Sequence, residues 1–240
     1  MKVTAGTLCG CNHRINEDSY ECGRLTDGSH FAVLCDGMGG MSGGLVASSF
    51  VVNYLSMLSM KTDMGKVGNM REWMTAAMYD CNAELYRLST RDTGKVTMGT
   101  TAIYVVVTGK KLYAVHSGDS RIYLIRSGKA ERITTDHSIV QELLDKGRIT
   151  EEQATKHPNR NIITSAIGVE RRPRIDYHET DLEDGDTVLL CTDGLSNSVS
   201  EDEMVSILEA SDFYRAADEM VRIGAEHGAQ DDQTALLLGV

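Results

Sequence analysis

The sequence has only two prolines in 240 residues and no long stretch rich in serine, glycine and proline. Flexible linkers between domains have that composition, so its absence predicts a single domain over residues 1–240. No apolar segment approaches the roughly 20 residues that a membrane span needs. The N-terminus also lacks the apolar core of a signal peptide. We therefore expect no membrane partner.

Basic residues are scarce relative to acidic ones. The sequence has 24 Lys and Arg against 35 Asp and Glu, which gives a net charge of −11. Such a chain lacks the positive charge that attracts nucleic acids or anionic membrane surfaces, so we expect no nucleic-acid partner. The excess acid is either solvated surface or a cluster of carboxylates that only bound cations make tolerable.

The spacing of a disulfide framework is missing as well. The six cysteines stand at irregular intervals, which indicates reduced thiols and a cytoplasmic protein. Cys9 and Cys11 form a Cys-x-Cys pair without a second pair. We therefore expect them to be small buried thiols rather than ligands of a zinc site.

Apolar periodicity predicts an α+β fold in which hairpin-linked strands and helices come in blocks. Two capping boxes, Thr150 with Gln153 and Ser200 with Glu203, indicate helix starts. The segment 137–168 reads as a polar, helical insert. Helical spacing covers 44–60, 71–89 and 212–227, and strands are expected over 3–8, 31–35, 100–108, 111–118, 121–134, 174–182, 187–194 and 233–240.

Carboxylates stand at the ends of several of these strands and near the N-terminus. The set comprises Glu17, Asp18, Asp36, Asp119, Asp193, Asp231 and Asp232. A single Asp-Gly pair is most often a turn, but Asp36 and Asp193 lead into glycine-rich or helical segments rather than a second strand. Gathered carboxylates repel one another unless cations neutralise them, and oxygen-only ligands suit Mg²⁺ or Mn²⁺.

Other nucleotide and metal motifs do not fit. The run "DGMGGMSGG" places Ser42 where a dinucleotide-binding G-x-G-x-x-G needs its last glycine, and no lysine follows as a P-loop requires. The sequence contains neither the spacing of an EF-hand nor H-E-x-x-H. The acids at the strand ends are therefore the main indication of function.

The order of the motifs resembles that of the metal-dependent Ser/Thr protein phosphatases, the PPM family, in its compact bacterial form. The resemblance implies a four-layer αββα sandwich, in which helix pairs flank two central antiparallel β-sheets and a helical flap covers about 137–168. It also implies hydrolysis of phosphoserine and phosphothreonine monoesters. The matching segments span nearly the whole chain: "NEDS" (16–19), "DGMGG" (36–40), "GTTA" (99–102), "GDSR" (118–121), "TTDHS" (134–138), "HPNRNIITSAIG" (157–168), "CTDGL" (191–195) and "DDQT" (231–234).

The resemblance implies that Asp36 bridges two Mn²⁺ or Mg²⁺ ions and that the Gly37 carbonyl binds the second ion. Asp193 and Asp231 then complete the protein ligands of the first. Two such ions lower the pKa of a bridging water and clamp the phosphoryl oxygens. The resulting hydroxide attacks phosphorus and the Ser or Thr alkoxide leaves, so no cysteine nucleophile is needed.

Further acids take supporting roles by the same resemblance. Glu17 and Asp18 stand where the family holds or ligates metal-bound water. Asp119, with help from Asp193, matches a weaker third-metal site of bacterial members. Asp232 replaces the asparagine of many members and is expected to support the ligands rather than bind an ion.

The sequence departs from the family pattern at two places away from the acids. Met38 follows the bridging Asp-Gly, where some members carry a histidine that serves as the leaving-group acid. Metal-bound water must then take that role. Ser165 replaces the usual flap arginine after "IIT".

Two residues are candidates for holding the substrate phosphate. In many members this residue is an arginine five positions before the Asp of "NEDS", and here His13 occupies that position while Arg14 follows it. If "CNHRINEDS" is a strand, only one of the two side chains faces the cleft. We expect Arg14 to do so through a bulge near Asn12, because a permanent charge suits a phosphate dianion. The alternative is that His13 holds the phosphate.

Four other polar residues are given structural roles. Asp136 and His137 are expected to cap a helix. His116 and His178 lie in strand patterns and are expected to be structural or surface residues.

The resemblance also implies partners. They are phosphorylated protein substrates and a cognate bacterial-type Ser/Thr kinase, and the protein is expected to be a monomer. Three rivals stay open: a phosphatase of a partner-switching pathway that acts on an anti-sigma-factor antagonist, a catalytically dead binding module of the same fold, and an unrelated cation-binding protein.

Overall fold

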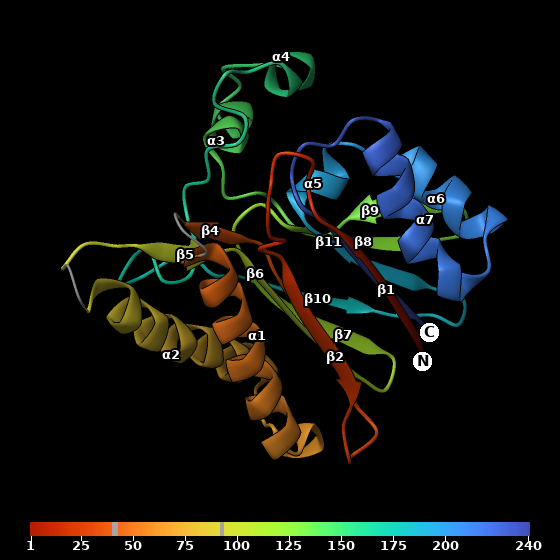
Figure 1. Ribbon diagram of the computed structural model, residues 1–240. Coiled ribbons are helices and arrows are strands. Elements are labelled where there is room, and N and C mark those ends of the chain that lie inside the picture. The colour runs from red at the N-terminus through yellow and green to blue at the C-terminus, as the bar shows by residue number, and fades with distance from the viewer. Residues whose placement is uncertain (40–42, 92–93) are drawn as a thin grey trace.

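Two β-sheets stacked face to face form the centre of the molecule, and helices cover the outer face of each sheet (Figure 1). The computed structural model describes residues 1–39, 43–91 and 94–240. Neighbouring strands pair antiparallel. One sheet consists, in spatial order, of β1 (Lys2–Leu8), β12 (Gln233–Gly239), β11 (Thr187–Cys191), β8 (Arg121–Arg126) and β9 (Lys129–Arg132).

The second sheet carries the N-terminal helices. A small separate ladder pairs β4 with β5 beside its end. The strand order is β10 (Asp176–Asp181), β7 (Lys111–Ser117), β6 (Ala102–Thr108), β3 (His30–Cys35) and β2 (Ser19–Arg24), and the further elements are β4 (Gly37–Gly39), β5 (Met98–Thr100), α1 (Gly43–Lys61), the 3-10 helix η1 (Met64–Lys66) and α2 (Met70–Thr90).

The remaining helices lie on the other sheet or project from the body. Figure 1 shows α5, α6 and α7 against the first sheet, whereas α3 and α4 stand apart above the sandwich. This arrangement confirms the predicted four-layer αββα architecture. The bounds are α3 (Ile139–Asp145), α4 (Glu151–Thr155), α5 (Asp193–Ser196), α6 (Glu201–Ala210) and α7 (Phe213–Glu226).

Strand β3 shows why the central strands are apolar throughout. Successive side chains of a strand point to opposite faces. Phe31 and Val33 therefore pack with α1 and α2, while Ala32 and Leu34 pack between the two sheets. Because both faces of the sheet are covered, the strand reads as a continuous hydrophobic run rather than as an alternating one.

Most predicted elements are confirmed, including both capping boxes. The strands β2, β4 and β5 were not predicted. The sequence of β2, "SYECGR", is polar and lies at the edge of its sheet, where a strong apolar pattern is not needed. Gly40, Met41 and Ser42 of the glycine-rich run lie outside the described residues.

Helix α1 corrects the expectation that no segment approaches a membrane span. Its 19 residues have a mean hydropathy of 1.3, so length and composition alone would let it cross a bilayer. Ala47, Val51 and Leu55 are nevertheless fully buried against the sheet. The helix is therefore apolar because it packs in the core of the second sheet.

The insert over 137–168 contains two short helices and is otherwise irregular. An isolated antiparallel bridge between Ser138 and Ile163 joins its two ends. Ser138 also caps α3, since its side chain accepts a hydrogen bond from the Gln141 N–H at 3.2 Å. The prediction that Asp136 and His137 cap this helix is wrong.

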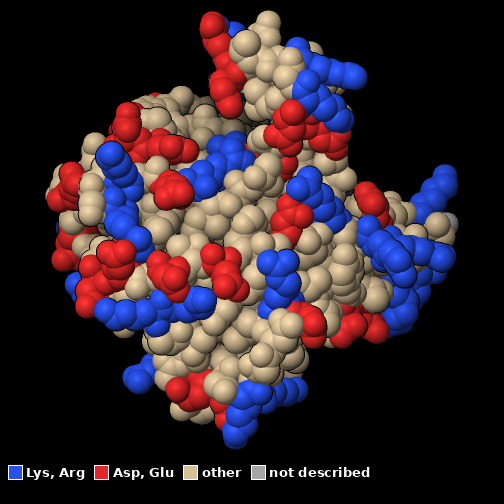
Figure 2. Space-filling view, turned by 180° about the vertical axis from the view of Figure 1, so that it is seen from behind, with Lys and Arg blue, Asp and Glu red and all other residues tan. Residues whose placement is uncertain are grey.

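Charges of both signs cover the surface. Figure 2 shows acidic and basic side chains interspersed over one face of the molecule. The excess of acidic residues therefore does not form one continuous negative patch on that face. Many of these side chains form exposed pairs, such as Lys146 with Glu142 at 3.1 Å. Such pairs contribute about 0–1 kcal/mol each to stability.

Candidate active site

The backbone of Asp36 is held at the end of β3 by two threonines of the "GTTA" segment. Its N–H donates to Thr101 Oγ1 at 3.0 Å, and its carbonyl accepts from the Thr101 N–H at 2.8 Å. Thr100 Oγ1 donates to the same carbonyl at 2.7 Å. This segment therefore fixes the backbone from which the Asp36 carboxylate projects.

Three segments meet beside Asp36 at distances that only glycine permits. A Cβ on Gly37 would lie 2.3 Å from the Gly44 carbonyl oxygen and 2.6 Å from that of Glu17. A Cβ on Gly44 would lie 2.5 Å from Glu17 Oε2. The Leu45 N–H donates to Glu17 Oε1 at 3.4 Å. The Glu17 carboxylate thus lies at the start of α1, where the helix dipole stabilises a negative charge.

Asp18 is buried, and only one of its two carboxylate oxygens is hydrogen-bonded. Its Oδ2 accepts from Thr192 Oγ1 at 3.0 Å and from Thr234 Oγ1 at 2.6 Å. Its Oδ1 is buried and has no hydrogen-bond partner among the residues that the structure describes. Burial raises the pKa of Asp18 to about 7, and the two threonine bonds offset this only in part. This oxygen is therefore available to a bound water or a cation.

The structure brings five predicted carboxylates into one electrostatic cluster: Asp18, Asp36, Asp119, Asp193 and Asp231. Burial, followed by the charges of Asp18 and Asp193, holds the pKa of Asp36 well above its usual range. Burial and the Asp193 charge raise the pKa of Asp119 in the same way. Burial and the Asp231 charge raise the pKa of Asp193 to about 6. The ionised cluster is costly without a counter-charge.

Asp232 joins the N-terminal loop to the final strand. Its carboxylate accepts from the backbone N–H groups of Gly10 and Glu17, both at 2.8 Å, and its Oδ2 lies 3.1 Å from His13 Nδ1. Burial raises the pKa of Asp232, but the bonds from Glu17, Gly10 and His13 outweigh it, so the pKa lies below its usual value. Asp232 is therefore an ionised support for this loop.

His13 and Arg14 lie in a turn, not in a strand. Residues 9–18 contain no strand, and the His13 N–H donates to the Gly10 carbonyl at 3.0 Å. The argument from strand alternation and from a bulge near Asn12 is therefore wrong. Both side chains are exposed, but His13 lines a cleft beside the acids, and Arg14 is not among the described residues that line it.

A network of two half-buried arginines and a buried aspartate lies next to the cluster and was not predicted. Arg121 Nη2 donates to Asp136 Oδ2 at 2.8 Å, and Arg132 Nη2 pairs with Asp136 Oδ1. The positive charge of Arg121 offsets part of the pKa rise of Asp119 and of Asp193. The only sequence signal was the position of Arg121 in "GDSR" and of Asp136 in "TTDHS", since Arg132 lies in neither segment.

A cleft of about 1000 Å³ opens beside Asp193 and Asp231. The N-terminal turn, α5, the loop after α7 and the insert with α3 and α4 form its walls. Three arginines face it, namely Arg121, Arg132 and Arg160. A cleft that combines acids with guanidinium groups suits an anionic substrate that binds together with cations.

The expectation of buried thiols is wrong for the Cys-x-Cys pair. Cys9 and Cys11 are both exposed, while Cys35, Cys81 and Cys191 are buried. Cys9 Sγ lies 3.7 Å from the His13 carbonyl oxygen. The pair is exposed because it belongs to the same turn as His13.

Comparison with known proteins identifies the family. The family model described as "Protein phosphatase 2C" matches residues 5–237. The chain therefore belongs to the protein phosphatase 2C family, the PPM phosphatases, and it is a metal-dependent protein serine/threonine phosphatase.

Relatives and solved structures agree with this membership. Protein phosphatase PhpP of Streptococcus pneumoniae is 36% identical over 243 residues, which cover 100% of this chain and 98% of the relative. The S. agalactiae serine/threonine phosphatase has a TM-score of 0.94 at 31% identity, with 100% of this chain and 99% of that chain covered. The catalytic domain of the serine/threonine protein phosphatase PstP, solved with two manganese ions, has a TM-score of 0.83 at 32% identity, with 98% and 96% covered.

Proposed function

We propose that this protein removes phosphate from phosphoserine and phosphothreonine side chains of other proteins, and that the carboxylate cluster is its active site. The observation that carries the proposal is the gathering of buried and half-buried acids with raised pKa values beside the large cleft. Such an arrangement is costly unless cations bind, and divalent cations can catalyse phosphate-ester hydrolysis.

The donors fit hard cations such as Mn²⁺ or Mg²⁺, because every candidate ligand is an oxygen. We assign two ions to this site. Asp36 would contact both, with the Gly37 carbonyl on one, and Asp193 and Asp231 would hold the other. The close glycine contact at Gly37 supports this, since a side chain there has no room.

We assign supporting roles to the remaining acids. The unpaired Oδ1 of Asp18 and the carboxylate of Glu17 would accept hydrogen bonds from water on the ions or ligate them. Asp119, together with Asp193, would hold a third and weaker ion. The shared electrostatics of Asp119 and Asp193 support that pairing.

When bound, the ions lower the pKa of a water molecule and neutralise the phosphoryl oxygens. We infer that His13 rather than Arg14 holds the substrate phosphate. Its hydrogen bond to Asp232 is the main reason that the pKa of His13 is raised, which favours the cationic ring. Because Nδ1 faces Asp232, Nε2 is the ring nitrogen available to a phosphate oxygen. Met38 has no proton to give to the leaving oxygen.

The cleft and the insert are the natural place for the polypeptide around the phosphorylated residue. We propose that residues 1–240 form one catalytic domain with the flap at about 137–168, and that the protein acts as a cytoplasmic monomer. Its substrates would be phosphorylated by a cognate Ser/Thr protein kinase. The sequence lacks the basic excess that would favour a nucleic-acid partner.

The function is tested with a phosphothreonine peptide and Mn²⁺, by phosphate release and by peptide binding in parallel. We expect turnover by the wild type and binding without turnover by Asp193→Asn. Peptide binding without turnover by the wild type would favour the inactive binding module. Uptake of Mn²⁺ without peptide binding and without turnover would favour an unrelated cation-binding protein. A preference of at least tenfold for a phosphorylated anti-sigma-factor antagonist would favour the partner-switching pathway.

A further inference from the structure

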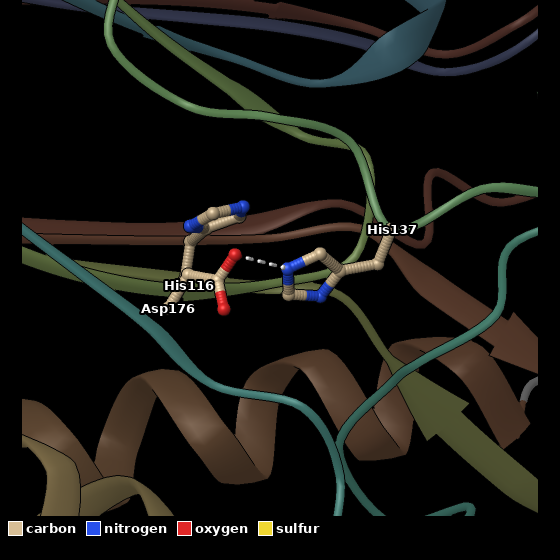
Figure 3. Close-up of side chains that lie close together, drawn as sticks. All are labelled: His116, His137 and Asp176. Carbon is tan, nitrogen blue, oxygen red and sulfur yellow. Dashed lines mark ion pairs between the residues drawn. The ribbon is translucent and has the colours of Figure 1, made fainter. Parts of the chain in front are cut away.

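Three histidines and an aspartate pack together where the insert leaves the body of the protein. His116 comes from β7, His137 precedes α3, and Asp176 and His178 belong to β10. The centroid of the His116 ring lies 4.6 Å from that of the His137 ring and 5.1 Å from that of the His178 ring. Figure 3 shows the His137 ring directed at the Asp176 carboxylate, and the Nε2 to Oδ2 distance is 3.2 Å. None of the four belongs to the carboxylate cluster.

The hydrogen bonds assign the protons of this group and argue against a cation there. His116 Nε2 lies 3.0 Å from the Thr135 carbonyl, so it carries the proton, and Nδ1 accepts from His178 Nε2 at 3.2 Å. His137 Nδ1 accepts from the Gly118 N–H at 3.3 Å, so its proton is on Nε2. Both nitrogens of His116 and Nδ1 of His137 are thus engaged in hydrogen bonds, and among the described residues His137 Nε2 is held only by its ion pair with Asp176. Burial lowers the pKa of His137, which favours the neutral ring.

Two hydrogen bonds join His137 to Gly118, the residue before Asp119. The Gly118 N–H donates to the His137 ring, and the His137 N–H donates to the Gly118 carbonyl at 2.9 Å. Gly118 has a φ of +110°, and a Cβ there would lie 2.6 Å from Thr101 Cγ2. Glycine adopts this conformation without strain but has the most flexible backbone, so the two hydrogen bonds of its N–H and carbonyl restrict the turn.

His137 also lies where the two ends of the insert join the body of the protein. The His137 carbonyl accepts from the Thr164 N–H at 2.7 Å, next to the bridge between Ser138 and Ile163. The His137 side chain is fully buried. The two ends of the insert and the turn that carries Asp119 therefore meet at one histidine.

We propose that His137 is a positioning residue, which holds the Gly118–Asp119 turn in the orientation that lets Asp119 take the third, weaker cation. Asp176 Oδ2 lies 3.2 Å from Nε2, and its negative charge favours the proton on that nitrogen, so that Nδ1 presents a lone pair to the Gly118 N–H. This inference rests on the proposed role of Asp119. It assigns to His137 and Asp176 a function that the resemblance does not supply.

The test is Mn²⁺ binding to the purified protein, followed by calorimetry, with the weakest site as the readout. His137→Ala should weaken that site about tenfold, because a buried hydrogen bond of roughly 1.4 kcal/mol is lost. His137→Asn should restore it, since the amide oxygen of asparagine occupies the place of Nδ1 and accepts from Gly118. His137→Gln should not, because its amide lies at the place of Nε2. The two tighter sites should keep their affinity in all three variants.

His178→Asn is the matched control, because it removes a neighbouring ring of the same cluster that does not contact Gly118. It should leave the weakest site unchanged, and circular dichroism checks the fold of each variant. Equal effects of Asn, Gln and Ala at position 137, or an unchanged weak site in all of them, would overturn the inference. Asp119→Ala separates the two proposals: if it leaves the weak site intact, the role of Asp119 fails and the inference fails with it.

Discussion

At the scale of single residues, the carboxyl group of Asp36 lies among those of Asp18, Asp119, Asp193 and Asp231, and each of them raises its pKa. Sequence reasoning found Asp36, Asp119 and Asp193 because each follows an apolar run. It found Asp231 because it precedes an apolar run, and Asp18 through the "NEDS" segment. It missed the groups that hold them. Hydrogen bonds such as that from Thr234 to Asp18 join residues 216 positions apart, and no local pattern encodes them.

Asp36→Asn should abolish turnover while making the metal-free protein more stable. The substitution removes one charge from a cluster in which burial and repulsion oppose ionisation. We expect turnover to fall by about 10³-fold, since the ions supply several kcal/mol of transition-state stabilisation. Thermal melting in EDTA and phosphate release with Mn²⁺ are the two measurements. Near-wild-type turnover at saturating Mn²⁺ would show that Asp36 is not a ligand.

His13→Ala should raise KM for a phosphopeptide more than Arg14→Ala does. His13 lines the cleft and is held next to Asp232, while Arg14 is not among the described residues that line the cleft. We expect a KM increase of about tenfold for His13→Ala, equivalent to one charge-assisted hydrogen bond of roughly 1.5 kcal/mol. Steady-state kinetics with a phosphothreonine peptide decide it. A larger KM increase for Arg14→Ala than for His13→Ala would mean that Arg14 holds the phosphate.

At the scale of elements, β4 and α1 meet through glycines, and this contact places Glu17 beside Asp36. Gly37→Ala should lower the free energy of unfolding by about 3 kcal/mol or more, because its Cβ would collide with backbone rather than with a flexible side chain. The melting temperature should fall by about 6–12 °C for a protein of this size.

Gly68→Ala is the matched control for this substitution. A Cβ at Gly68 meets nothing within 4 Å, and the residue needs no positive φ. Its melting temperature should be unchanged or slightly higher, because alanine restricts the unfolded chain. A Gly37→Ala variant as stable as Gly68→Ala would mean that α1 does not pack as closely as the structure has it.

The elements also show where sequence reasoning stopped. Alternation and helical spacing located most of the strands and helices because burial imposes those patterns. The choice between His13 and Arg14 rested on the condition that "CNHRINEDS" is a strand, and the structure has a turn there instead. Likewise, Asp136 and His137 precede a helix in sequence, yet the fold pairs them with Arg121 and Asp176 instead.

At the scale of the whole molecule, protons and cations compete for the same carboxylates. The pKa of Asp18 is raised to about 7 and that of Asp193 to about 6. A raised pKa in the folded state stabilises the metal-free protein below about pH 4, and this stabilisation is lost as pH rises through about 6 to 7. The advantage of the Mn²⁺-bound protein over the metal-free one should therefore grow with pH.

We expect the difference in melting temperature between samples in Mn²⁺ and in EDTA to be larger at pH 7.5 than at pH 5.5. Buried histidines such as His116, whose pKa is lowered to about 3, destabilise both samples alike on acidification, so they cancel in the difference. A difference that is constant over this range would mean that the ions do not displace protons from the cluster.

The central claim is that the gathered carboxylates hold the cations on which phosphate hydrolysis depends. The most direct measurement counts Mn²⁺ per chain by equilibrium dialysis and follows phosphate release from a phosphothreonine peptide in the same samples. The account predicts two tightly held ions, turnover that disappears when EDTA removes them, and recovery when Mn²⁺ is returned. Full turnover by protein that retains no divalent cation would contradict it.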